Sequence, residues 1–153
     1  MTFNLTKDQI EIQQRARQIA STLVAENAVE VDKSEQYPWD NVKALTDAGF
    51  VGMTIPKKYG GPGRSFLEAN LVVEEMAAYC GPTGRIAVEA NMGAISAVMH
   101  YGTDFQKRLA AELVLAGDKP AICITEPDAG SAASQMTTRA DKCLSLIHIS
   151  EPT

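Results

Sequence analysis

The sequence predicts a mainly α-helical protein, with a helical bundle over residues 1–118 followed by the start of a β-rich region. Two observations support this prediction. First, three hydroxyl residues are each followed three positions later by Gln or Glu and then by an apolar helical repeat, the pattern of a capping box. These residues are Thr6, Ser65 and Thr103. Second, the helical repeat stops after Lys119-Pro120, where strand-favouring residues begin.

Helix start and stop signals place five helices in the bundle. The first begins after Thr6 and the second near Pro38, a residue that the first turn of a helix tolerates. The third begins after Ser65, and the sequence GPTG at 81–84 is expected to end it. The fourth is expected to run unbroken to Gly102, and the fifth from Thr103 to Gly117. The fourth helix rests on the apolar spacing of Ala87, Met92, Ile95 and Met99.

A second region is expected from residue 119. The run AICIT at 121–125 is rich in strand formers, and residues 133–149 show no helical period. So short a region cannot form an independent sheet domain. We therefore expect residues 119–143 to be the incomplete start of a β-domain in a truncated chain.

Composition narrows the possible functions. A net charge of −5 argues against a nucleic-acid partner, and no apolar run approaches the roughly 20 residues that span a bilayer. The N-terminus has no secretion signal, so we expect a cytoplasmic protein. Cys80, Cys123 and Cys143 follow no ligand pattern and are expected to be buried reduced thiols, and no metal site is expected.

The stretch ITEPDAGSAAS at 124–134 is either a linker or a binding loop. Pro127 removes a backbone donor and restricts one φ angle. Gly130, among small neighbours, would let backbone N–H groups approach a ligand closely. Thr125 and Ser131 add hydroxyls that donate or accept hydrogen bonds. Such a surface suits a flat cofactor with polar edges, although an ordinary exit from a strand into a loop remains an alternative.

The order of these features resembles the acyl-CoA dehydrogenase family of flavoproteins. That family has a helical bundle followed by the signature C-x-T-E-P-x-A-G-S-D and then T-x-A. This chain reads CITEPDAGS and then TTRADK. The segments LTKDQIEIQQRAR, ALTDAGFVGMTIPKKYGG and YGTDFQKRLAAELVLAGDKPA also fit, so the resemblance covers residues 3–142.

The resemblance implies an N-terminal helical domain, a middle β-barrel-like domain and a C-terminal four-helix domain, with FAD bound between the last two in a homotetramer. It implies that Thr125 bonds the isoalloxazine edge and that Ser131 contacts the acyl-CoA. The residues implied to lie beside the flavin are Ile122, Cys123, Ile124, Thr125, Gly130 and Ser131. The implied reaction is α,β-dehydrogenation of an acyl-CoA thioester with hydride transfer to the flavin, and an electron-transfer flavoprotein is then a possible partner. The catalytic base would lie beyond the chain, so the fragment itself is expected to be inactive.

Two departures point to a specialised subgroup. Ala132 stands where the family usually has Asp, and Asp128 where Gly is common. Arg85 is expected to face the acyl pocket, where burying a guanidinium is costly without an anionic partner. Arg suits an acid group such as a carboxylate or sulfinate, so Arg85 is a candidate substrate-binding residue. The apolar neighbours expected around it are Ile86, Val88, Met92 and Ile95.

These features resemble the desulfinases of the family, which cleave a C–S bond on the same scaffold without net flavin reduction. Desulfination is thus the alternative to dehydrogenation, and an exposed structural role is the alternative for Arg85. A third possibility is a non-catalytic helical interaction module.

The last ten residues, LSLIHISEPT at 144–153, match the translation of a transposon-end sequencing adapter. We expect them to be non-native. A genuine strand is the alternative, because apolar residues alternate along the segment.

Overall fold

The computed structural model describes residues 4–143 and 146–150. The chain divides into two compact units, one ending at Ala121 and the other beginning at Ile122. The predicted mainly α-helical fold is confirmed.

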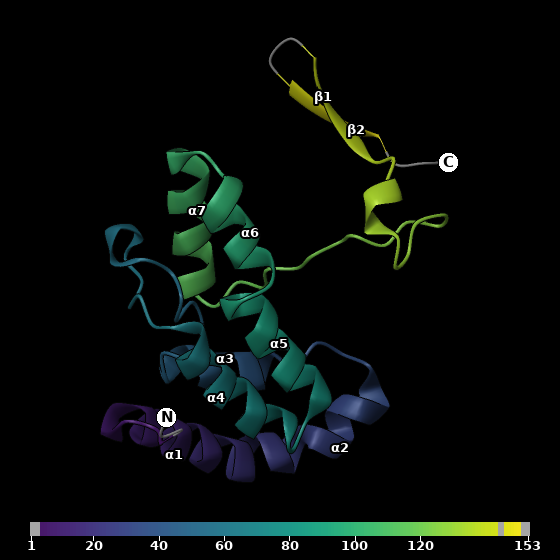
Figure 1. Ribbon diagram of the computed structural model, residues 1–153. Helices are drawn as coiled ribbons and strands as arrows, with labels where there is room; N and C mark the ends of the chain where they lie inside the picture. Colours follow the sequence, from purple (N-terminus) through teal and green to yellow (C-terminus); the bar gives the residue numbers. More distant parts are fainter. Residues whose placement is uncertain (1–3, 144–145, 151–153) are drawn as a thin grey trace. The chain divides into compact units, whose positions relative to one another are not determined.

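The first unit is a helical bundle (Figure 1). A long helical segment opens it, formed by α1 (Lys7–Ile19), a π-helical turn (Ala20–Val24) and α2 (Ala25–Ser34). The remaining helices are α3 (Trp39–Asp47), α4 (Phe66–Ala77), α5 (Gly81–Asn91), α6 (Ala94–Tyr101) and α7 (Asp104–Leu115), with a 3-10 turn at Lys57–Tyr59. Helix α4 packs against α1 and α5, and α6 packs against α7.

All three predicted capping boxes are present. The hydroxyls of Thr6, Ser65 and Thr103 each accept a hydrogen bond from the backbone N–H three residues on, and the Gln or Glu at that position bonds back to the cap. The apolar faces behind them form one core. It includes Ile12 and Ala16 of α1, Val72 and Met76 of α4, and the residues Val24, Leu45, Phe50, Ile55, Ile95 and Ala111.

The predicted role of GPTG at 81–84 is wrong in one respect. The segment forms the first turn of α5, because Pro82 is tolerated there. Gly84 also permits a close helix contact, since a Cβ at this position would lie 2.6 Å from the Cβ of Ala77 on α4. The backbones of α4 and α5 can therefore approach each other here.

The predicted single helix through Ala87 and Met99 is also wrong. The structure breaks it between Asn91 and Ala94 into α5 and α6. The apolar repeat continues through the break, which is why the pattern did not reveal it. The break is stabilised by polar side chains, among them Glu89, whose Oε2 accepts a hydrogen bond from the N–H of Ala94 at 3.1 Å.

The second unit holds a 3-10 turn (Ala133–Gln135) and an antiparallel hairpin of β1 (Arg139–Cys143) and β2 (Leu146–Ser150), in which Arg139 pairs with Ser150. The strand expected at 121–125 is not formed, because no described strand lies beside it to complete a ladder. Strand β2 falls in the predicted adapter-derived tail. An isolated two-stranded hairpin is marginally stable in water, so this pairing does not distinguish a native strand from an appended one.

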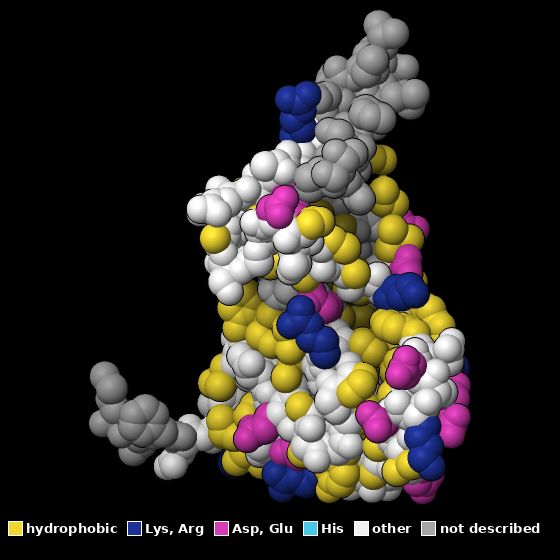
Figure 2. Space-filling model, turned by 90° about the vertical axis from the view of Figure 1, so that its right-hand side faces the viewer, with side chains coloured by type: hydrophobic (Ala, Val, Ile, Leu, Met, Phe, Trp, Pro, Cys, Tyr) yellow, Lys and Arg dark blue, Asp and Glu magenta, His cyan; other side chains and the backbone are white. Residues whose placement is uncertain are grey.

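Lys, Arg, Asp and Glu side chains are interspersed on the face of the helical unit in the lower part of Figure 2. Among the described residues, no helix has both the length and the apolar content needed to cross a membrane. Cys80 is buried as expected, whereas Cys123 is exposed, contrary to expectation, because it lies in the unpaired segment before the signature loop.

Candidate functional site

Arg85 lies in the second turn of α5 and forms an ion pair with Glu89, one turn further along the helix. The side chain of Arg85 is 66% exposed, whereas that of Glu89 is only 11% exposed. The pair therefore joins a buried carboxylate to a guanidinium that reaches the surface. Most of the guanidinium's five N–H donors stay available to a ligand.

The Glu89 carboxylate is held at both of its oxygens. Oε1 pairs with Arg85, and Oε2 accepts the N–H of Ala94 at the start of α6. An anion is favoured at this position by the unpaired N–H groups and the dipole of the helix N-terminus. Gly93 makes the arrangement possible, because a Cβ there would lie 2.2 Å from Oε2.

A surface groove of about 380 Å³ runs beside Arg85. Most of its lining side chains are apolar, and two charged side chains, Arg85 and Glu35, also line it. The lining residues are Val31, Glu35, Gln36, Tyr37, Pro38, Pro82, Arg85 and Ile86. The apolar part of this groove can hold an apolar group, and an acid at the end of that group would be favoured beside Arg85 and disfavoured beside Glu35.

Only part of the apolar neighbourhood expected for Arg85 is found there. Ile86 lies in the same groove. Ile95, by contrast, is 1% exposed within the core, and Met92 packs against that core. Neither residue is among those that line the groove beside Arg85.

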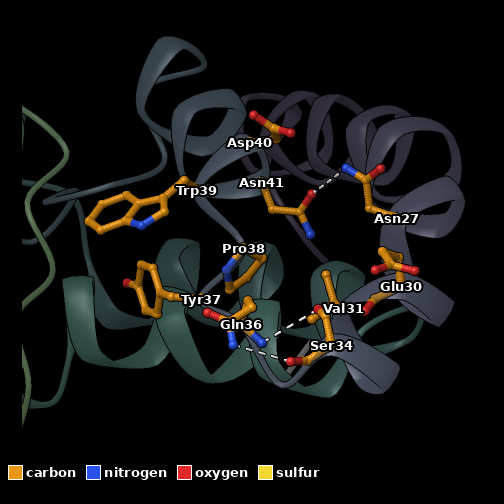
Figure 3. A pocket seen from close by; sticks show the side chains of 10 residues that line it. All are labelled: Asn27, Glu30, Val31, Ser34, Gln36, Tyr37, Pro38, Trp39, Asp40 and Asn41. Atoms are coloured by element: carbon orange, nitrogen blue, oxygen red, sulfur yellow. Dashed lines mark hydrogen bonds between the residues drawn. The ribbon is translucent and has the colours of Figure 1, made fainter.

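A second pocket, of about 270 Å³, shares the linker 36–38 with this groove (Figure 3). Its amides bond to one another or to neighbouring helices. Asn27 Nδ2 donates to Asn41 Oδ1 at 2.9 Å, and Asn41 Nδ2 donates to the Thr83 hydroxyl at 2.9 Å. These bonds tie α2, α3 and α5 together, so this pocket is a structural junction.

Tyr37 and Trp39 pack at the start of α3, as their position beside Pro38 suggests. Their rings meet edge to face with centroids 4.7 Å apart, and the Lys119 ammonium lies 4.8 Å and 5.3 Å from the two centroids. Burial, followed by the charge of Asp118, raises the pKa of the Tyr37 hydroxyl. Both rings thus serve the packing of the linker.

In the second unit, the signature loop exposes the residues expected to meet the flavin. Ile122, Cys123, Ile124, Thr125, Gly130 and Ser131 are all exposed. Within the described part of the chain, no ladder hydrogen bond occupies the backbone of 122–125. A reciprocal pair of backbone bonds closes the turn, from Glu126 N to Ala129 O at 3.1 Å and from Ala129 N to Glu126 O at 3.2 Å. The loop therefore presents free donors and acceptors on a closed turn.

Glu126 anchors this loop, a role that the sequence analysis did not identify. Its carboxylate accepts the N–H of Thr137 and the N–H of Thr138, each at 2.8 Å, together with the Thr137 hydroxyl at 3.2 Å. These bonds, the one from the Thr137 backbone first, lower the pKa of Glu126 from 4.5 to about 2. The motif TTRADK is thereby fastened to the signature loop.

The Glu126 bonds predict a pH dependence for the loop. A carboxyl group with a lowered folded-state pKa contributes fully above its ordinary value of 4.5, and its contribution is lost as the pH falls toward about 2. The amide NMR shifts of Thr137 and Thr138 are therefore expected to titrate with a midpoint near 2, and Glu126→Gln is expected to abolish this titration.

Asp128→Asn is the matched control, because Asp128 lies in the same turn but accepts none of these bonds. It is expected to leave the midpoint unchanged. A midpoint near 4.5 in the unsubstituted chain would contradict the anchoring role of Glu126.

Residues 6–118 match the family described as acyl-CoA dehydrogenase, N-terminal domain. The 3-sulfinopropanoyl-CoA desulfinase of Variovorax paradoxus is 61% identical over 140 residues, which are 92% of this chain and 35% of that enzyme. The short-chain-specific acyl-CoA dehydrogenase of Clostridium acetobutylicum is 35% identical over 141 residues, 92% of this chain and 37% of that protein.

Among solved structures, butyryl-CoA dehydrogenase from Megasphaera elsdenii superposes with a TM-score of 0.81 at 29% identity, over 92% of this chain and 38% of that one. This chain thus spans little more than a third of the length of these relatives. The family match covers the helical unit that carries Arg85, and the chain belongs to the acyl-CoA dehydrogenase family.

Proposed function

We propose that this chain is the N-terminal part of a desulfinase that acts on an acyl-CoA bearing a sulfinate group, with Arg85 holding that group. The observation that carries the proposal is the exposed Arg85 guanidinium beside an apolar groove. A planar guanidinium binds a two-oxygen acid group through parallel hydrogen bonds. The much higher identity to a desulfinase than to a dehydrogenase, 61% against 35%, supports the same choice.

The proposed reaction converts 3-sulfinopropanoyl-CoA and water into propanoyl-CoA and hydrogen sulfite. The C–S bond breaks, its electron pair stays with carbon, and carbon takes a proton from water. The hydroxide that remains from the water joins the sulfur, which leaves as hydrogen sulfite. Carbon is reduced as sulfur is oxidised, so no external electron acceptor is required.

The second unit offers groups that fit a flavin. Thr125 and Ser131 present exposed hydroxyls, and Gly130 has open space where a side chain would stand. We propose that residues 122–131 hold the edge of an FAD and that Ser131 also contacts the acyl-CoA. A flavin bound there would supply a hydride acceptor for dehydrogenation, and it would undergo no net reduction in desulfination.

Dehydrogenation remains the second candidate, supported by the general character of the family. With a plain acyl-CoA as substrate it would leave Arg85 without an acid to bind, and it would add an electron-transfer flavoprotein as a partner. A homotetramer and a cytoplasmic location are proposals common to both candidates.

A chimera tests the choice between these reactions. Residues 1–143 of this chain replace the aligned residues of the Variovorax paradoxus enzyme. We expect the chimera to release sulfite from 3-sulfinopropanoyl-CoA with kcat/KM within about tenfold of the parent enzyme. If it instead binds FAD, bleaches the flavin with propanoyl-CoA and releases no sulfite, the proposal is wrong and dehydrogenation is favoured.

A further inference from the structure

The buried carboxylate of Glu89 links Arg85 to the junction between α5 and α6. Glu89 as a whole is 8% exposed. Its Oε1 pairs with Arg85, and its Oε2 accepts the N–H of Ala94. A surface arginine without such a partner would sample many side-chain conformations. Here the Glu89 carboxylate accepts a hydrogen bond from the N–H of Ala94, which fixes its position relative to the backbone. The side chain of Arg85 therefore pairs with a carboxylate that is held in place.

The local sequence is arranged around this carboxylate. Glu89 lies four residues after Arg85, which places both on one face of α5. Gly93 leaves the space that its Oε2 occupies, and any side chain there would force the carboxylate away. Two separate features, the ion-pair spacing and the glycine, therefore favour the same geometry.

The geometry points to Glu89 as a positioning residue for substrate recognition, a role that rests on the proposed function of Arg85. Glu89 occupies one edge of the guanidinium and leaves the others to the substrate's acid group. It holds Arg85 ready before the substrate arrives, so binding does not have to immobilise a long flexible side chain.

A purely structural alternative is that Glu89 only caps α6. Glu89→Gln separates the two roles, because the glutamine Oε1 can still accept the Ala94 N–H but an amide cannot form an ion pair with Arg85. Glu89→Ala removes both interactions. The comparison of these two variants isolates the ion pair.

The first measurement uses the 153-residue chain and does not depend on any activity. The side-chain Nη2–H signal of Arg85, assigned with Arg85→Lys, is expected to be dispersed and protected in the unsubstituted chain. It is expected to move to the averaged position of free arginines in Glu89→Gln, while the Ala94 amide stays in place. An unchanged Arg85 signal in Glu89→Gln would overturn the positioning role.

The second measurement uses the chimera. Glu89→Gln is expected to raise KM for 3-sulfinopropanoyl-CoA about tenfold, the size expected for immobilising one long side chain at binding, with kcat changed less than twofold. The affinity for propanoyl-CoA, which has no acid group, is expected to stay within about twofold. An unchanged KM, or an equal loss for both ligands, would overturn the inference.

Arg85→Ala in the chimera, compared with Glu89→Gln, separates the inference from the proposed function. If Arg85→Ala leaves the processing of the sulfinate substrate unchanged, the proposed function fails and the recognition role of Glu89 fails with it. If Arg85→Ala impairs the processing of the sulfinate substrate but Glu89→Gln does not, only the positioning role of Glu89 is overturned.

Discussion

Arg85→Ala is expected to lower kcat/KM of the chimera for 3-sulfinopropanoyl-CoA about a hundredfold. Hydrogen bonds to charged groups contribute about 1.5–3 kcal/mol each, and every 1.4 kcal/mol is tenfold. The affinity for propanoyl-CoA should hardly change, because that ligand has no acid for Arg85 to bind. Steady-state kinetics on the sulfinate substrate, together with binding of propanoyl-CoA, measure the two effects.

Arg108→Ala is the matched control. Arg108 is also exposed, at 64%, and also pairs with a carboxylate one turn away, Asp104. Arg108→Ala is expected to leave kcat/KM for 3-sulfinopropanoyl-CoA and the affinity for propanoyl-CoA unchanged. The kcat/KM of Arg85→Lys for 3-sulfinopropanoyl-CoA should lie between those of the parent chimera and Arg85→Ala, because lysine keeps the charge but loses the planar pair of donors. Equal kinetics for Arg85→Ala and the parent chimera would remove the basis of the proposed function.

Asn91→Ala is expected to destabilise the helical unit by about 3–5 kcal/mol. The Asn91 side chain is fully buried, its Oδ1 accepts the N–H of Met53 at 2.7 Å, and its Nδ2 donates to the carbonyl of Phe50 at 2.8 Å. Alanine would leave both buried backbone groups without partners, at about 1–3 kcal/mol each, and would also leave a cavity. Asn91 thereby connects the end of α5 to the loop at 50–54.

Thermal unfolding of the 153-residue chain measures this effect, with an expected fall in Tm of roughly 10–20 °C. Asn70→Ala is the control, because Asn70 is exposed on α4 and, within the part of the chain that the structure describes, its side chain bonds to the carbonyl of Phe66 in its own helix. Its effect should lie within about 0.5 kcal/mol. Equal Tm values for the two variants would show that the Asn91 hydrogen bonds do not stabilise the loop at 50–54.

The importance of Asn91 extends to the candidate site. The same helix, α5, carries Arg85 near its start and Asn91 at its end, with Glu89 between them. Loosening the end of α5 would disturb the junction at which Glu89 holds the first turn of α6. Stability and recognition are therefore expected to be coupled through this short segment.

Two of the predictions that the structure overturned, the single helix through Met99 and the strand at 121–125, failed because each depends on contacts with other parts of the chain. The run from Ala87 to Met99 has an unbroken apolar repeat, and the run at 121–125 has strand-forming residues. In the first case, polar contacts at Glu89 and Asn91 stabilise a break that the apolar pattern conceals. In the second, a strand needs a neighbouring strand, which local composition cannot supply.

Sequence alone determined the features that depend on residues three or four apart. The capping boxes at Thr6, Ser65 and Thr103 define their helix starts because donor and acceptor lie within one turn. Residue order alone also gave two further features. The signature CITEPDAGS predicted the family, and Arg85 suggested an acid-bearing substrate.

Tertiary structure alone decided how those residues are held. Asn91 bonds to backbone groups some 40 residues away, and Glu126 bonds to Thr137 and Thr138 across a turn. Such contacts depend on where the folded chain brings distant groups together. A hydrogen bond is decided by the distance between its atoms in space, and residue order specifies that distance only within a turn or two of the chain.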